Sequence, residues 1–190
     1  MQRRSQRRYT LGEYFAVEEV SNVKHEYYDG EIFAMAGSSL RHNHITANVL
    51  TLFRTGLRAS DCSAFSSDLR LQTPGGFFTY PDVMVICGQV VLARDRPDTV
   101  TNPTLLVEVL SESTREYDCG DKFGHCREIP TLRDYLLIEQ DKVFVEHFQL
   151  GPNKIWAPTS HDTLSEVVAL SSVNIALPLS EVYQQVFKQP

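Results

Sequence analysis

The run Leu105-Leu106-Val107-Glu108-Val109-Leu110 restricts the possible folds of this chain more than any other segment does. Apart from Glu108 it is apolar at both odd and even positions, which is typical of a central strand covered on both faces. Such a strand needs a layer of helices or a second sheet on each side. We therefore predict a mixed central β-sheet flanked by helices, of the α/β or α+β class.

The chain has 190 residues, a length typical of one domain. We expect a basic flexible tail at residues 1–8 and a single domain at residues 9–190. The net charge of -6 argues against a basic protein that coats nucleic acid. It does not exclude a nuclease whose carboxylates act through a metal ion.

No segment approaches the roughly 20 apolar residues that a membrane helix needs. The basic residues at the N-terminus are not followed by a hydrophobic segment of the kind found in secretory signals. We therefore expect a cytoplasmic protein with no membrane partner.

Two helices are predicted by their caps and periodicity. Thr10 is expected to cap a helix that runs to about Val20, with Glu13 completing a capping box. The clearest helical pattern covers residues 39–59, where Ser38 or Ser39 can serve as the cap. Shorter helices are expected at about residues 119–129 and after Pro178.

Strands are predicted from alternation and from turn residues. Asp29-Gly30 tolerates the positive φ of a tight turn, so residues 26–35 are expected to form a hairpin. Residues from Pro97 to Pro103 are expected to form a loop. Further strands are expected at residues 63–72, 77–87, 104–110, 134–139 and 142–149, and near Trp156.

The four cysteines form no C-x-x-C pair. We therefore predict free thiols in a reducing compartment. These residues are Cys62, Cys87, Cys119 and Cys126.

Two carboxylates lie in or beside the most apolar strands. Asp82 follows Tyr80-Pro81 and precedes an apolar run, and Glu108 interrupts the central strand. A buried carboxylate is costly unless it is paired or binds a metal ion. Two on neighbouring strands would repel each other, and Mg²⁺ or Mn²⁺ would relieve that repulsion. The alternative is that each carboxylate caps a strand end or pairs with an arginine.

A lysine is the natural third member of such a site, because its charge can hold a scissile phosphate and help to activate water. Lys122 follows the Glu108 strand, on the next predicted helix, and can reach back to the strand end. The alternative is a solvated surface lysine that pairs with Asp118, one helical turn earlier.

Short motifs follow one another in order along nearly the whole chain, from about residue 9 to about residue 187. They are Lys24-His25-Glu26-Tyr27-Tyr28-Asp29-Gly30-Glu31, His42-Asn43, Tyr80-Pro81-Asp82-Val83, Leu106-Val107-Glu108-Val109-Leu110-Ser111 and Tyr117-Asp118-x-Gly120-x-Lys122-Phe123. Together they resemble the Uma-type restriction endonuclease family, which belongs to the PD-(D/E)xK nuclease superfamily. The resemblance implies a restriction-endonuclease-like fold and a Mg²⁺-dependent (or Mn²⁺-dependent) endonuclease that hydrolyses phosphodiester bonds in DNA.

The resemblance also implies site residues. Asp82 and Glu108 match the two acidic metal ligands, and the main-chain carbonyl of Val109 matches a third ligand. In the superfamily's basic pattern the catalytic lysine stands two residues after the glutamate, where this chain has Leu110. Relatives of this type carry the lysine on the following helix, where Lys122 matches it.

Further positions are matched on other segments. Glu26 matches an acidic position that lines the site, and His42 matches a helix histidine that faces the same cleft. Glu112 stands where relatives tend to have proline, and Cys126 stands where they tend to have tyrosine. These departures bear on activity more than on fold.

Two other functions stay open. A catalytically silent nuclease-fold module would keep the fold and serve for binding or assembly. A hydrolase of a small phosphoester or nucleotide would use the same residues on another substrate. Endonucleases of this fold often pair to cut both strands, so a homodimer is expected by analogy.

Overall fold

The computed structural model describes residues 7–35, 37–112 and 114–188. Its helical segments are α1 (Leu11–Val20), α2 (Leu40–Gly56), η1 (Leu57–Ala59), α3 (Arg115–Tyr117), the π-helical η2 (Asp118–Lys122), α4 (Phe123–Cys126) and α5 (Leu179–Val182). Residues 1–6 of the tail expected at residues 1–8 lie outside the described part. Arg7 and Arg8 form ion pairs with Glu13 and Asp29, at 3.0 and 2.8 Å.

The described residues form two six-stranded sheets and one separate hairpin. The first sheet holds β1 (His25–Tyr28), β2 (Glu31–Ala34), β4 (Arg70–Gln72), β5 (Phe78–Thr79), β7 (Leu92–Ala93) and β8 (Arg96–Val100). The second holds β3 (Cys62–Ser66), β6 (Val83–Cys87), β9 (Leu105–Leu110), β10 (Asp134–Glu139), β11 (Val145–Leu150) and β12 (Trp156–His161). The hairpin joins β13 (Val167–Leu170) to β14 (Ile175–Pro178).

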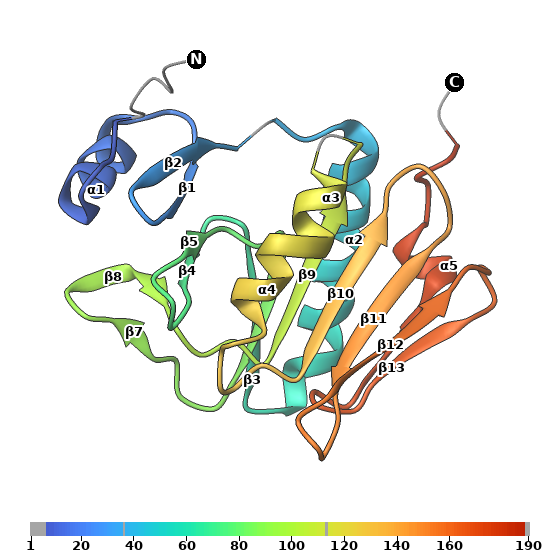
Figure 1. Cartoon of the computed structure of the whole chain (residues 1–190). Coiled ribbons are helices and arrows are strands. Elements are labelled where there is room, and N and C mark those ends of the chain that lie inside the picture. Colours follow the sequence, from blue (N-terminus) through green and yellow to red (C-terminus); the bar gives the residue numbers. More distant parts are fainter. Residues whose placement is uncertain (1–6, 36, 113, 189–190) are drawn as a thin grey trace.

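Strand order is β2-β1-β5-β4-β8-β7 in the first sheet and β12-β11-β10-β9-β6-β3 in the second. Each sheet mixes one parallel pairing, β4 with β8 or β9 with β10, with antiparallel ones. The predicted class, a mixed α+β fold with helices beside mixed sheets, is confirmed (Figure 1).

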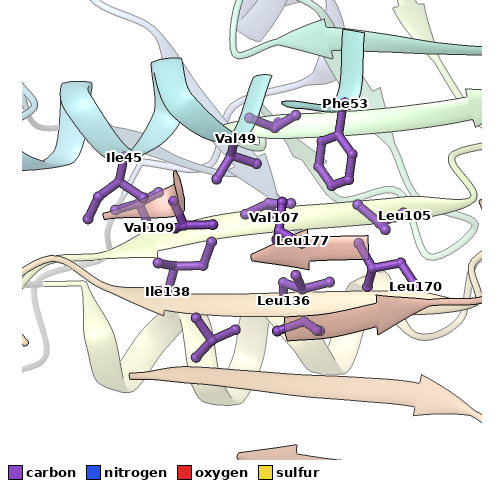
Figure 2. Packing of buried hydrophobic residues seen from close by; sticks show 14 of the residues in the cluster. Ile45, Val49, Phe53, Leu105, Val107, Val109, Leu136, Ile138, Leu170 and Leu177 are labelled. Carbon is purple, nitrogen blue, oxygen red and sulfur yellow. The ribbon is translucent and has the colours of Figure 1, made fainter. Parts of the chain in front are cut away.

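The predicted central strand is β9, and all of its residues are buried. Alternation sends Val107 and Val109 toward α2, where they pack with Ile45, Val49 and Phe53 (Figure 2). The even-numbered residues face the opposite way, and Leu106 packs in a second cluster with Phe123, Cys126, Tyr135 and Leu137. Glu108 has the same parity as Leu106. It therefore lies on the face that η2 and α4 cover, as Figure 1 shows for these helices.

The predicted cap and hairpin are confirmed. Thr10 and Glu13 form a reciprocal capping box at the start of α1. β1 and β2 pair through a turn in which Asp29 and Gly30 both have positive φ, at 43° and 83°. Gly30 tolerates this conformation without steric cost because it has no Cβ.

Several predicted boundaries are wrong, because single runs of alternating residues serve two sheets. Residues 63–72 divide into β3 and β4, and residues 77–87 divide into β5 and β6. Pro81 has no N–H to donate, which favours a break between β5 and β6. Part of the loop expected at residues 97–103 belongs to β8, which pairs with β4 and β7. The hairpin of β13 and β14 was not predicted.

The prediction of four free thiols is wrong for two of them. Cys62 and Cys87 form a disulfide, and their Cα atoms are 3.9 Å apart. They stand directly opposite each other on antiparallel strands β3 and β6, and a search for C-x-x-C spacing cannot detect such pairing. Cys119 and Cys126 are free.

Among the described residues, no helix combines the length and the apolar character required to cross a bilayer.

Candidate active site

Asp82 and Glu108 stand opposite each other at one end of the second sheet. β6 and β9 are antiparallel with Val83 beside Val107, so the residue before Val83 is brought next to the residue after Val107. Asp82 Oδ2 accepts a hydrogen bond from the Val109 N–H at 2.8 Å. The two predicted metal ligands are therefore neighbours.

His42 contacts Asp82 from the first turn of α2. Ser39 caps that helix and accepts a hydrogen bond from the His42 N–H at 3.1 Å, which fixes where the first turn begins. The His42 Nε2 atom lies 3.1 Å from Asp82 Oδ2. His42 thus lies against Asp82, and the cleft expected at this position stays a prediction.

Lys122 is buried among three carboxylates. Its Nζ atom lies 2.9 Å from Glu108 Oε2, 3.3 Å from Glu26 Oε1 and 3.4 Å from Asp118 Oδ1. Only 3% of Lys122 is exposed. A solvated surface lysine is therefore excluded, although the pairing with Asp118 that accompanied that alternative is present.

Glu26 reaches the cluster from β1, in the first sheet. Its Oε1 atom also accepts a short hydrogen bond from the Thr79 hydroxyl, and its Oε2 atom accepts one from the Tyr117 hydroxyl at 2.7 Å. Glu26 is 5% exposed. Both of its carboxylate oxygens are therefore engaged by protein donors.

The cluster carries more acidic than basic groups, because three carboxylates contact one ammonium and a fourth, Asp82, stands beside Glu108. Burial raises the pKa of Glu108 well above its usual value, and the nearby Asp118 and Asp82 raise it further, against the opposing effect of Lys122. Burial likewise raises the pKa of Asp118. For Lys122, burial lowers the pKa, but the carboxylates of Glu108, Glu26 and Asp118 outweigh burial and hold that pKa well above its usual value.

One oxygen of Glu108 has no hydrogen-bond partner among the described residues. Oε2 contacts Lys122, whereas Oε1 is buried and accepts no hydrogen bond from any described residue. A buried acceptor left without a partner costs about 1–3 kcal/mol. An unpartnered carboxylate oxygen beside a second carboxylate fits a hard cation such as Mg²⁺, which prefers oxygen ligands.

In the described part of the chain, no group of three or more His, Cys, Asp and Glu side chains is arranged to hold a metal ion. This finding is compatible with magnesium, which commonly binds one or two carboxylates and takes its other ligands from water and substrate phosphates. The N–H of Val109 bonds Asp82, and ligation by the Val109 carbonyl stays a prediction.

The sequence reasoning missed two partners of the predicted residues, Tyr117 and Thr79. Tyr117 stands directly before Asp118 in the motif that also supplies Lys122. That proximity in sequence was a usable signal. Thr79 precedes Tyr80-Pro81-Asp82, but nothing in the strand pattern distinguishes its hydroxyl from that of any other strand threonine.

The two departures from the relatives' pattern fall in different surroundings. Glu112 is exposed, in the turn before α3. Cys126 is fully buried in the apolar cluster on the Glu108 side of the sheet, and burial raises the pKa of its thiol.

Comparison with known proteins gives matches over nearly the whole chain. A family model described as "Uma2: Putative restriction endonuclease" matches residues 11–180. The uncharacterized protein slr1290 of Synechocystis sp. (strain ATCC 27184 / PCC 6803 / Kazusa) is 37% identical over 175 residues, which cover 90% of each chain. The uncharacterized protein sll1609 of the same organism is 39% identical over 151 residues, which cover 79% of this chain and 85% of that protein.

A solved structure has a similar fold. The crystal structure of a putative nuclease belonging to DUF820 from Anabaena variabilis ATCC 29413 superposes with a TM-score of 0.72. The match covers 88% of this chain and 93% of that chain, at 17% sequence identity. At this identity the likeness concerns the fold.

Proposed function

Because the chain belongs to the Uma2 family of putative restriction endonucleases, we propose that it is a metal-dependent endonuclease that hydrolyses phosphodiester bonds in DNA. Glu108 carries this proposal, because one of its oxygens contacts Lys122 while the other lies buried without a described partner. Asp82 stands beside it, directly before the neighbouring strand β6. Two carboxylates can hold a metal ion and a lysine can supply positive charge, which are two means by which phosphodiester hydrolysis is catalysed.

Asp82 and Glu108, with the carbonyl of Val109, would hold Mg²⁺ or Mn²⁺. A bound ion of this kind polarises the phosphate and lowers the pKa of a bound water. His42 and the Val109 N–H both contact Asp82 Oδ2 and thereby orient that carboxylate. The Lys122 ammonium, 2.9 Å from Glu108, would stabilise the charge on the phosphate or orient the attacking water.

The catalytically silent module remains the second candidate, and one observation favours it. All three Lys122 contacts given above are with carboxylates, as in a structural ion-pair cluster. A homodimer, in which two copies each cut one strand, belongs to the first proposal. Sedimentation that shows only monomer at micromolar concentration would count against that assembly.

The test is cleavage of supercoiled and single-stranded DNA with Mg²⁺, with Mn²⁺ and with EDTA. We expect cleavage only with metal, and we expect Asp82→Asn, Glu108→Gln and Lys122→Met to abolish it. Asp121→Asn is the matched control, because Asp121 is exposed on the same turn as Lys122. Activity retained by all three variants would place the reaction elsewhere in the protein. Competition between duplex DNA and free nucleotides would distinguish an endonuclease from a hydrolase of small phosphoesters.

The unmodified protein could fold and bind Mn²⁺ but cut neither substrate. If Glu108→Gln then lost Mn²⁺ binding, the metal site would be real and the substrate would be a different one. A protein that neither cuts nor binds metal would favour the silent module.

A further inference from the structure

We propose that Glu26, Asp118 and Tyr117 are positioning residues, which hold the Lys122 ammonium against Glu108 and bind no metal ion themselves. Their importance for catalysis rests on the nuclease function proposed above. The contacts themselves belong to the protein without metal or DNA, so they can be tested whether or not the protein cuts DNA.

The position of the ammonium is set by its acceptors. A lysine side chain is a flexible four-carbon stem, so the stem alone does not fix the charge. An ammonium has three donors, and Lys122 meets one carboxylate from each of three elements: Glu108 in β9, Glu26 in β1 and Asp118 in η2. Removal of any one acceptor would let the charge move.

Glu26 and Glu108 differ in a way that assigns them different tasks. Each oxygen of Glu26 is already engaged, Oε1 by Thr79 and Lys122 and Oε2 by Tyr117. Glu108 has a buried oxygen with no described partner. Glu108 is therefore suited to a cation, whereas Glu26 is suited to orienting the lysine.

Tyr117 couples this arrangement to the helix that carries the lysine. Its hydroxyl bonds Glu26 at 2.7 Å, while Asp118 is the next residue and contacts Lys122 directly. The segment is π-helical, and single turns of this kind are frequent at functional sites. The π-helical segment therefore carries the lysine and one acceptor, and the preceding residue fixes a second acceptor.

The variants are Glu26→Gln, Asp118→Asn and Tyr117→Phe, with Asp121→Asn as control. Asp121→Asn removes one exposed carboxylate from the same turn. It therefore shows the effect of losing one negative charge, which Glu26→Gln and Asp118→Asn also lose. Tyr117→Phe removes no charge and a single oxygen atom, so it is informative if either carboxylate variant fails to fold. Mn²⁺ affinity is measured by calorimetry, and the Lys122 ammonium is followed by nitrogen NMR, its signal being assigned from its loss in Lys122→Met.

We expect Tyr117→Phe to bind Mn²⁺ like the unmodified protein, and the two carboxylate variants to bind it like Asp121→Asn. We expect the ammonium signal to shift or to broaden in all three. In cleavage assays kcat should fall by about 10- to 100-fold at unchanged KM, as expected when a catalytic group is misplaced.

Two results would overturn the proposal whether or not the protein cuts DNA: loss of Mn²⁺ binding in Glu26→Gln as severe as in Glu108→Gln, or an ammonium signal that none of the substitutions alters. A kcat that none of them changes, in a protein that does cut DNA, would overturn it as well. A protein that cuts nothing would refute the nuclease function alone, since the ammonium signal would still decide whether these residues hold Lys122.

Discussion

His42 and Asp82 contact each other between α2 and the start of β6, with His42 Nε2 3.1 Å from Asp82 Oδ2. The same oxygen accepts the Val109 N–H at 2.8 Å. A helix and the neighbouring strand thus jointly hold one carboxylate. Each contact restricts the rotation of that side chain.

From this contact we expect His42→Ala to lower Mn²⁺ affinity by about 10- to 100-fold, the usual effect of removing a group that orients a ligand. His161→Ala is the control. His161 lies on the edge strand β12 and pairs with Glu166. Calorimetry measures both. Unchanged affinity in His42→Ala would mean that the backbone of Val109 orients Asp82 sufficiently.

The disulfide should stabilise the protein. Cys62 and Cys87 are separated by 25 positions, and closing a loop of that length in the unfolded chain corresponds to about 3.5 kcal/mol. We expect Cys62→Ser with Cys87→Ser to lower the free energy of unfolding by about that amount in urea titrations. Addition of a reductant should destabilise the unmodified protein but not the double variant. Equal unfolding midpoints with and without the reductant in the unmodified protein would contradict the prediction.

The core on the α2 side should be sensitive to a loss of volume. Phe53 is 0% exposed and packs against the second sheet, so Phe53→Ala should cost about 3–5 kcal/mol. Phe33 is the same residue type but 47% exposed on the edge strand β2. Phe33→Ala should therefore change the unfolding midpoint far less. Comparable losses in the two variants would show that the packing around Phe53 is not what stabilises this face.

Tyr80 should make stability depend on pH in the alkaline range. Burial, followed by the hydrogen bond to Glu18, raises the pKa of Tyr80 from 10.0 to about 12. The folded protein therefore keeps the phenol neutral at a pH where the unfolded chain ionises it. The stabilisation is complete below about pH 10 and is lost as the pH rises toward 12. The measurement is the urea midpoint of unfolding as a function of pH. Over this pH range the midpoint should fall less steeply for Tyr80→Phe than for the unmodified protein. Identical slopes for the two proteins would contradict the assigned direction.

Much of the site could be anticipated from short motifs, and its internal contacts could not. Glu108 stands out because it interrupts an apolar strand, and Lys122 is the lysine on the next helix. The contact between Lys122 and Glu26 joins the helical segment η2, which packs on the second sheet beside Glu108, to strand β1 of the first sheet. No local spacing encodes that contact, because it depends on how the sheets lie relative to each other.

The fold shows the same division. The caps at Thr10 and Ser39 were predictable because a cap depends only on its neighbours in sequence. The division of residues 77–87 between two sheets was not, since alternation is the same in either sheet. The pairing of Cys62 with Cys87 was missed for a related reason, because it follows from strand register rather than from sequence spacing.

Because side chains alternate along β9, Glu108 also bears on the register of the central strand. A slip of one residue against β6 and β10 would exchange the two faces of the strand. The carboxylate would then enter the hydrocarbon around Val49 and Phe53, where no described cationic side chain belongs to the cluster. A misaligned central strand would keep this carboxylate buried but remove it from the Lys122 ammonium, and a buried charge without its partner is costly. The residue proposed for metal binding therefore also disfavours a shifted register of the central strand.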